Sequence, residues 1–378
     1  MKSYSVLPWL MSNVLSRRYL VDIDNNLMTT YDTLNVFGNV IDTITIGDLN
    51  IAVMEIDGDP IGLYANDFVN NIEFDTTVTI DKNYQHVLTG KYSSSDEKSY
   101  YLQDNPPWNL DRIDQRHSEL DGRYFYPTSG GSEVNVFVVD TGIDVKHKDF
   151  KGRALWGGNF ADNVNTDCNS HGTHVAGTIG SESYGVSKST RLIAVKVLSC
   201  DGSGSMSGVL KGLEYVINQS KKATKPCLVN MSLGGGRSES LNRGIRQLTS
   251  NNIHVIVAAG NENQDACNTS PASEDTAMTV GATTRANKLA GFSNWGKCVD
   301  ILAPGTEILS TVPGDKTAVL QGTSMASPAV AGVYALLLSE NPTFTPHTMK
   351  GVMAKTCTKN AIQDLRSDTH NCLVYSMN

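Results

Sequence analysis

The chain has 378 residues and a formal net charge of −8, with 40% hydrophobic and 19% charged residues. This length and composition indicate a globular protein with a large core and more than one compact part. The acidic balance, without any basic stripe, argues against a nucleic-acid partner, and no apolar run approaches the roughly 20 residues of a membrane-spanning helix.

The first residues carry an ambiguous signal. Lys2 precedes a short apolar run at 6–15, which Pro8, Ser12 and Asn13 interrupt. A secretory signal needs an uninterrupted apolar stretch and a small-residue cleavage site. We therefore expect an irregular lead-in to the first strand, with a signal peptide as the alternative.

Residues up to about 80 have the pattern of a small α+β domain. Strands are expected at 19–26, 42–57 and 70–80, and a helix-like turn at 60–68. The following segment, 81–103, is polar and Ser-rich, as exposed and protease-sensitive linkers are.

Beyond this linker, apolar β-branched runs alternate with segments of helical periodicity. The expected strands are 133–140, 191–198, 227–234, 254–260 and 277–283, and the expected helices are 206–222, 240–252 and 325–338. Strands that are apolar almost throughout are buried on both faces, so the alternation predicts an α/β fold with a doubly wound, mostly parallel sheet. Sites in such sheets lie beyond the carboxyl ends of the strands.

Three Gly-rich segments carry an Asp, a His and a Ser. They are VVDTGID, NSHGTHVAG and GTSMASP, which contain Asp140, His171 and Ser324. A hydroxyl becomes a good nucleophile when an imidazole removes its proton, and a buried carboxylate orients that imidazole. Asp140 directly follows an expected strand, and Ser324 precedes an expected apolar helix with its unpaired N–H groups. The set predicts nucleophilic catalysis.

Plainer interpretations of the same residues exist. Asp140 could be a turn residue and Ser324 a helix N-cap. His171 and His174 have a metal-like spacing, but no Glu follows His171 and no third ligand is evident, so His174 is expected to be a hydrogen-bonded structural residue. DGSGS at 201–205 could be only a flexible turn.

These motifs resemble those of the subtilisin-like serine proteases, within them the proteinase K branch, over residues 106–376. The resemblance implies a subtilisin-like α/β fold in 104–378, preceded by a ferredoxin-like propeptide domain in 1–80 and a processing linker in 81–103. It implies a serine endopeptidase that works through an acyl-enzyme and is made as a self-processing zymogen. Its partners would be protein or peptide substrates and its own propeptide as intramolecular inhibitor, in a monomer. The alternatives are a silent subtilase fold used for binding, or a narrow-specificity protease that cuts only itself or one partner and keeps its propeptide.

The resemblance also assigns binding residues. Asn261 would share the oxyanion with the backbone N–H of Ser324. The pocket for the residue before the scissile bond would favour apolar side chains and give broad specificity. The residues expected to bind the substrate chain and to line that pocket are Gly202, Ser203, Gly204, Ser232, Leu233, Gly234, Ala258, Ala259 and Gly260.

The chain has seven cysteines, and the resemblance suggests how four of them pair. The resemblance pairs Cys168 with Cys200 and Cys267 with Cys298, each closing a loop of about 30 residues worth roughly 3–4 kcal/mol. Cys357 and Cys372 are an open pair, and Cys227 is left as a buried thiol. Disulfides favour an oxidising, extracellular setting, although the chain start shows no clear signal peptide.

Structural Ca²⁺ is expected at two clusters of oxygen ligands. The first, from the resemblance, is Asp300 with the carbonyls of Asp275 and Ala277. The second cluster, which the resemblance also suggests and for which a solvated acidic loop is the alternative, consists of Asp111, Asp114, Gln115 and Asp121.

Overall fold

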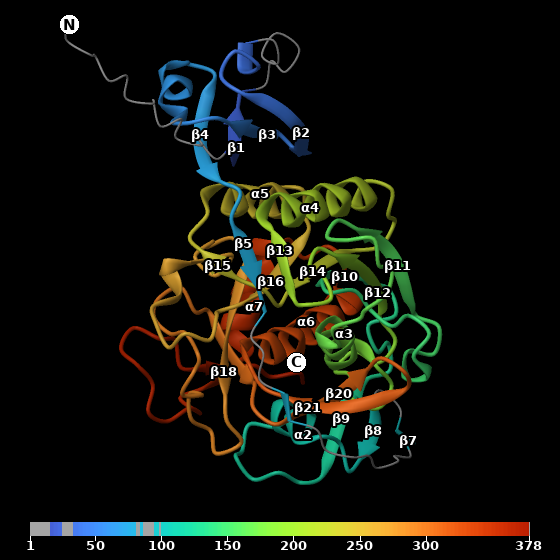
Figure 1. The fold of residues 1–378 in the computed structure, drawn as a ribbon. Coiled ribbons are helices and arrows are strands. Elements are labelled where there is room, and N and C mark those ends of the chain that lie inside the picture. The colour runs from blue at the N-terminus through green and yellow to red at the C-terminus, as the bar shows by residue number, and fades with distance from the viewer. Residues whose placement is uncertain (1–15, 25–32, 81–83, 86–93, 98–99, 378) are drawn as a thin grey trace, which may run out of the picture. The chain divides into compact units, whose positions relative to one another are not determined.

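The computed structural model describes residues 16–24, 33–80, 84–85, 94–97 and 100–377. The apolar run near the chain start therefore lies outside the described residues. The chain divides into two compact units (Figure 1). Unit 1 is residues 1–44 and 50–75, and unit 2 is residues 45–49 and 76–378.

Unit 1 is built on a four-stranded sheet in the order β2-β3-β1-β4. The strands are β1 (Arg17–Ile23), β2 (Asn39–Ile46), β3 (Leu49–Ile56) and β4 (Val69–Phe74). β1 runs antiparallel to both β3 and β4, as in a ferredoxin-like split β-α-β arrangement. A 3₁₀ helix, η1 (Pro60–Ala65), fills the expected helix-like turn. The stretch 42–57, which we expected as one strand, is instead a hairpin because Gly47 turns the chain with φ +58°.

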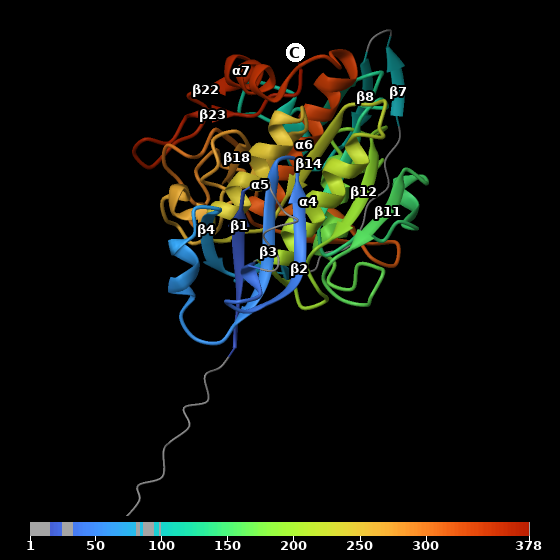
Figure 2. The ribbon, with the colours of Figure 1, turned by 90° about the horizontal axis from the view of Figure 1, so that it is seen from above.

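Unit 2 contains a nine-stranded sheet whose strand pairs are parallel except for the last one. Figure 2 shows β18, β14, β12 and β11 following one another in the order that the pairing gives. In sheet order the strands are β11 (Ala154–Asn159), β12 (Arg191–Lys196), β10 (Asn135–Asp140), β14 (Cys227–Met231), β16 (His254–Ala258), β18 (Met278–Thr283), β19 (Ile301–Pro304), β23 (Cys372–Leu373) and β22 (Thr358–Lys359).

Helices cover both faces of this sheet (Figure 1). α4 packs with α5, and α3 packs with α6 on the other side. The helices of unit 2 are α2 (Trp108–Ile113), α3 (His171–Gly180), α4 (Met206–Ser220), α5 (Glu239–Ser250), α6 (Thr323–Glu340) and α7 (Pro346–Thr356), with the 3₁₀ turns η2 (Lys148–Phe150) and η3 (Ala266–Asn268). The α/β class with a mostly parallel sheet, expected from the alternating pattern, is confirmed.

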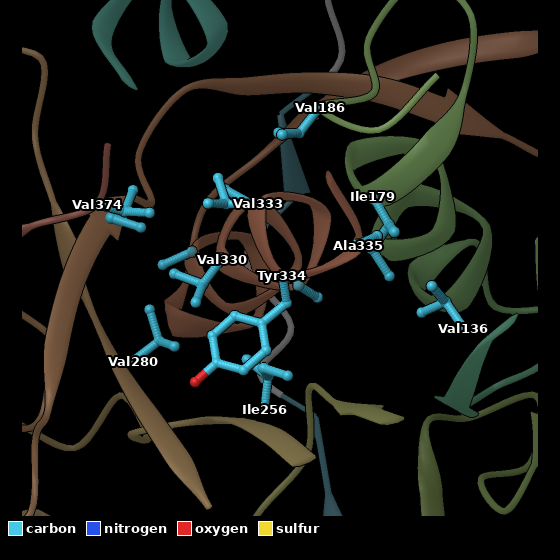
Figure 3. Close-up of a cluster of buried hydrophobic side chains, with 14 of the residues drawn as sticks. Val136, Ile179, Val186, Ile256, Val280, Val330, Val333, Tyr334, Ala335 and Val374 are labelled. Carbon is cyan, nitrogen blue, oxygen red and sulfur yellow. The ribbon is translucent and has the colours of Figure 1, made fainter. Parts of the chain in front are cut away.

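The core of unit 2 forms around α6, whose residues 323–338 are all buried. Figure 3 shows its Val330, Val333 and Tyr334 among side chains from several strands, including Ile256 and Val280. A helix that is apolar all round must lie inside the molecule, which explains its central position. Among the described residues, no helix combines the length and apolar character needed to cross a bilayer.

Short strands outside the large sheet form small ladders. These are β5 (Thr77–Thr79) with β13 (Ser203–Ser205), β15 (Gly235–Gly236) with β17 (Thr269–Ser270), β20 (Ile308–Val312) with β21 (Lys316–Leu320) and β6 (Tyr84–Gln85), and β7 (Ser94–Glu97) with β8 (Tyr100–Asp104) and β9 (Arg123–Pro127). The expected exposed linker thus differs at its end, because Gln103 is buried in β8 and donates to Ser183 O at 2.9 Å.

Three disulfides close loops in unit 2. They join Cys168 to Cys200, Cys267 to Cys298 and Cys357 to Cys372, with Cα–Cα separations of 5.0, 5.4 and 5.4 Å. Cys227 is a buried free thiol, and burial raises its pKa to about 11. The pair that the sequence left open is therefore bonded, and the seventh cysteine is an apolar core residue.

Candidate active site

The structure joins Asp140 and His171, which lie 31 residues apart in the chain. Asp140 ends β10 at the carboxyl edge of the sheet, and His171 begins α3. His171 Nδ1 lies 2.8 Å from Asp140 Oδ1 and 3.0 Å from Oδ2. Both side chains are almost completely buried, and the carboxylate also accepts from Thr141 N at 2.7 Å. Because a carboxylate only accepts, Nδ1 carries the proton and Nε2 is left as a base.

A second buried carboxylate, Asp167, holds the two segments together. It accepts from the backbone N–H groups of Asn169, Ser170 and Thr173 at 3.0, 3.0 and 2.9 Å. It also accepts from Thr141 Oγ1 at 2.9 Å, next to the Asp140 position. Burial raises the pKa of Asp167. Sequence reasoning missed this residue; the Asp two residues before NSH was its only signal.

Close approach of α3 to Asp140 depends on Gly172. A Cβ there would lie 2.1 Å from Gly142 O and 3.1 Å from Asp140 Oδ1. Only a residue without a side chain lets the first turn of the helix pass the carboxylate. This explains the Gly that directly follows His171.

Ser324 is the second residue of α6 and is buried. Pro328, four residues later, has no N–H to donate to Ser324 O, as the helix would require. Ser232 Oγ donates to this carbonyl at 3.0 Å instead. Asn230 Nδ2 donates to Ser232 Oγ at 2.9 Å, so the β14 end fixes the first turn of α6.

No hydrogen bond joins His171 and Ser324 among the described residues. The Ser324 hydroxyl donates to Ser232 O at 3.2 Å, and the buried His171 Nε2 has no described partner. The helices that these residues begin pack against each other. Hydrogen bonds at catalytic sites are often long or misaligned before substrate binds, so this rotamer is compatible with a nucleophile and base pair.

Asn261 lies beside the Ser324 backbone. Its Oδ1 accepts from Thr323 N at 2.7 Å and from Thr323 Oγ1 at 2.9 Å, which fixes the side-chain amide. Gly322 marks the space between the two N–H donors, because a Cβ built on it would lie 3.6 Å from both Asn261 Nδ2 and Ser324 N. Two donors therefore flank one open point, as a developing oxyanion requires.

The expected substrate-binding segments hold a strand of the chain itself. β5 pairs antiparallel with β13, so that Thr79, Val78 and Thr77 face Ser203, Gly204 and Ser205. Thr79 N donates to Gly234 O at 3.1 Å, and Gly234 N donates to Thr79 O at 3.3 Å.

The strand continues to Ile80, whose N–H donates to Gly202 O at 3.2 Å. Val78 is fully buried and Ile80 is 5% exposed. Recognition is through main-chain hydrogen bonds on both sides, with alternate side chains buried, as in β-strand addition. The segment 70–80, which we expected as one strand, thus splits into β4 and β5.

A second strand pairing of this segment lies at β6. There Tyr84 and Gln85 pair antiparallel with Leu320 and Val319 of β21, a few residues before Ser324. The chain thus pairs with β13 before the interval 81–83 and with β21 after it.

The remaining expected pocket residues lie at the end of β16. Ala258 and Ala259 are buried, and Gly260 N donates to Thr323 Oγ1 at 3.1 Å. Leu233, from the opposite segment, is 3% exposed. The end of the segment 258–260 is thereby bonded to the first residue of α6.

His174 is separate from this chemistry. Its Nε2 lies 2.9 Å from Ile308 O and 3.1 Å from Ala318 O, so it is the protonated nitrogen of a neutral ring. Burial lowers the pKa of His174 to about 3. It has the geometry expected of a structural histidine.

The first expected Ca²⁺ cluster does not fit a metal ion. Asp275 O, Ala277 O and the Asp300 carboxylate do converge, but on the ammonium of Lys350. Asp300 is the only carboxylate in the set, and both its oxygens already contact this ammonium. The expectation of Ca²⁺ at this cluster is therefore corrected. The expected oxygens do converge, but the cation between them is the Lys350 ammonium.

The second cluster offers one free carboxylate oxygen, although carboxylate oxygens of Asp111, Asp114 and Asp121 do not all lie within 4.8 Å of one another. Asp111, Asp114 and Asp121 repel one another, and burial with this repulsion raises the pKa of Asp114 to about 8. Asp114 Oδ2 accepts from Phe125 N at 2.8 Å, whereas its Oδ1 is buried without a described partner. Gln115 Nε2 donates to Glu119 O. An orphaned oxygen among carboxylates is the donor chemistry that suits Ca²⁺.

Comparison with known proteins agrees with this geometry. Residues 131–370 match the model of the subtilase family. Cerevisin of Saccharomyces cerevisiae is 46% identical over 299 residues, which are 72% of this chain and 47% of cerevisin. Subtilisin-like protease 6 of Arthroderma benhamiae is 47% identical over 282 residues, covering 72% of this chain and 68% of the relative.

A solved structure gives the same answer. The crystal structure of a cold adapted subtilisin-like serine proteinase is 44% identical, with a TM-score of 0.70, and covers 73% of this chain and all of that one. The chain spans about half the length of cerevisin. The resemblance stated from the motifs is confirmed: the chain belongs to the subtilase family of serine proteases.

Proposed function

We propose that this chain is a serine endopeptidase that hydrolyses peptide bonds through an acyl-enzyme. The observation that carries the proposal is the buried hydrogen bond between His171 Nδ1 and Asp140, which leaves Nε2 as a base next to the helix that Ser324 begins. Ser324 Oγ attacks the peptide carbonyl while His171 Nε2 takes its proton, and Asp140 stabilises the resulting imidazolium. His171 then protonates the leaving amine, and water hydrolyses the ester by the same route.

The tetrahedral oxyanion would lie between Asn261 Nδ2 and Ser324 N. Both donors are held before substrate arrives, Asn261 by two bonds from Thr323 and Ser324 N by the helix start. Fixed donors lower the barrier without any reorganisation during the reaction. The buried Ala258 and Ala259 support a preference for apolar side chains before the scissile bond.

The occupied binding segments support synthesis as a zymogen. β5 is bonded as a substrate strand would be, and β6 continues on the far side of the interval 81–83. We therefore place the processing bond between Ile80 and Tyr84, at the start of the expected 81–103 linker. Unit 1 with this tail would act as the propeptide and intramolecular inhibitor until the bond is cut.

A structural Ca²⁺ at the second cluster belongs to the same proposal. Asp114 would supply its free oxygen, with Gln115 close by, and Asp111 and Asp121 would turn toward the ion, which would offset the mutual repulsion of the three carboxylates. It would stabilise the loop after α2 and take no part in peptide hydrolysis.

The test is intact-mass measurement and N-terminal sequencing of the purified chain, beside Ser324→Ala, followed by casein hydrolysis. We expect the wild-type chain to lose about 80 residues and then digest casein, while the variant keeps its full mass. A wild-type chain that processes itself but never cleaves casein would favour a self-only protease. A wild-type chain that behaves like the variant in both assays would contradict the enzyme proposal.

A further inference from the structure

The ammonium of Lys350, in α7, lies in a cradle of four oxygens. Lys350 Nζ lies 2.8 Å from Asp275 O, 2.6 Å from Ala277 O, and 2.9 Å from each oxygen of the Asp300 carboxylate. Three of these contacts use the three N–H donors that an ammonium has. All three N–H donors of the lysine are thus used within this cradle.

The cradle is rigid and set by the sheet. Asp300 immediately precedes β19, and its Oδ2 also accepts from Thr279 N at 2.8 Å in the neighbouring strand β18. Asp275 and Ala277 lie in the turn that leads into β18. Lys350 thus places a positive charge against both oxygens of this carboxylate.

Two carbonyls and a bidentate carboxylate are also the ligand types of Ca²⁺, which binds oxygens at about 2.3–2.6 Å. An ion at that distance from the same four oxygens would coincide with the Lys350 Nζ position. We propose that Lys350 is the built-in cation of this site, which makes the chain independent of Ca²⁺ there, and that the cradle becomes a Ca²⁺ site when the ammonium is removed.

The surroundings give a metal ion a way in once the lysine is shortened. A pocket of about 730 Å³ adjoins the cradle and is lined by Lys350, Asp275, Thr276 and Pro346 among others. It would supply the water molecules that complete six to eight oxygen ligands. Access is therefore not what keeps Ca²⁺ out of the wild-type cradle.

Lys188 offers a matched control. Its Nζ donates to two carbonyls, Glu182 O at 2.8 Å and Gly185 O at 3.0 Å, and no ion pair joins it to a carboxylate among the described residues. Lys188→Ala thus removes a lysine from two carbonyls but leaves no charged ligand. It should lose stability without acquiring a response to Ca²⁺.

The test is calcium titration by calorimetry together with thermal melts in EDTA and in about 5 mM CaCl₂, a concentration above the weak-site range. All variants carry Ser324→Ala, which prevents self-digestion, and Asp114→Asn, which disables the second cluster. We expect no calcium response from this parent. Lys350→Ala should melt about 5 °C or more lower in EDTA, and Ca²⁺ should recover most of that loss.

Adding Asp300→Asn to Lys350→Ala should abolish the recovery. Calcium binding by the parent that Asp300→Asn removes would overturn the proposal, as would a folded Lys350→Ala chain that does not respond to Ca²⁺. If Lys350→Ala does not fold, the parent titration alone decides, with binding against the proposal and no binding for it. None of these outcomes depends on proteolytic activity.

Discussion

Replacing Asn261 by Ala tests the proposed oxyanion site most sharply. The variant removes one of two N–H donors that flank the point beside Gly322, and leaves Ser324 N in place. Loss of one such donor typically lowers turnover by about 10²–10³-fold, a barrier increase of about 2.7–4 kcal/mol. Because the donor acts on charge that develops only in the transition state, kcat should fall while KM changes little.

Asn261→Ala also lowers the stability of the fold, and this loss must be distinguished from the loss of turnover. Asn261 Oδ1 accepts two hydrogen bonds from Thr323, and both disappear with the side chain. An unpaired buried donor costs about 1–3 kcal/mol, which lowers Tm by several degrees.

Thr323→Val is the matched control. It keeps Asn261 but removes two bonds of the Thr323 hydroxyl, the 2.9 Å bond to Asn261 and the 3.1 Å bond from Gly260 N. It should lower Tm by a comparable amount but reduce kcat far less. Initial rates on a chromogenic peptide with processed enzyme, beside melts of each variant, separate the two effects. If Asn261→Ala keeps kcat within about fivefold, or if Thr323→Val loses as much, the assignment of the donor is wrong.

Three further predictions concern stability and inhibition. Burial lowers the pKa of His254 to about 4, so the unfolded state takes up its proton first as pH falls below about 6.5; His254→Gln should make the loss of unfolding free energy between pH 6.5 and 4.5 about 2 kcal/mol smaller in urea melts, and an unchanged slope would exclude this role. Replacing Cys357 and Cys372 by Ser opens a loop of 15 residues and should cost about 3 kcal/mol, seen as a lower Tm with the other two bridges intact in peptide maps. Truncating Val78 and Ile80 to Ala removes five buried side-chain carbons, about 4 kcal/mol, and should shorten the lag before casein hydrolysis; a lag as long as that of the wild type would mean that β5 does not hold the inhibitor in place.

Local sequence was sufficient to predict the main sheet and the contact between Asp140 and His171. The expected strands at 133–140 and 254–260 correspond to β10 and β16, because fully buried strands are apolar throughout and end at Gly-rich turns. Motif order predicted that Asp140 and His171 would meet, although they lie 31 residues apart. These features are encoded within a few residues of where they act.

Features that depend on distant partners could not be predicted in the same way. Lys350 lies 50 residues from Asp300, and nothing in its helical surroundings marks it as the ion that fills the cradle. The division of 70–80 into β4 and β5 depends on which sheet each half meets, since both halves have strand-like alternation. Asp167 lies within the motif region of the sequence, but its role rests on five hydrogen bonds that form only in the folded loop.

The central claim is that one hydroxyl, activated by one imidazole, does the chemistry. Its most direct test is labelling of the chain with a fluorophosphonate probe, after the variants, which do not process themselves, have been cut in the linker by an added metalloprotease, followed by mass spectrometry of the labelled peptide. The account predicts a single adduct on Ser324, absent in Ser324→Ala and greatly slowed in His171→Ala. An adduct on another residue, or labelling that is indifferent to His171, would contradict it.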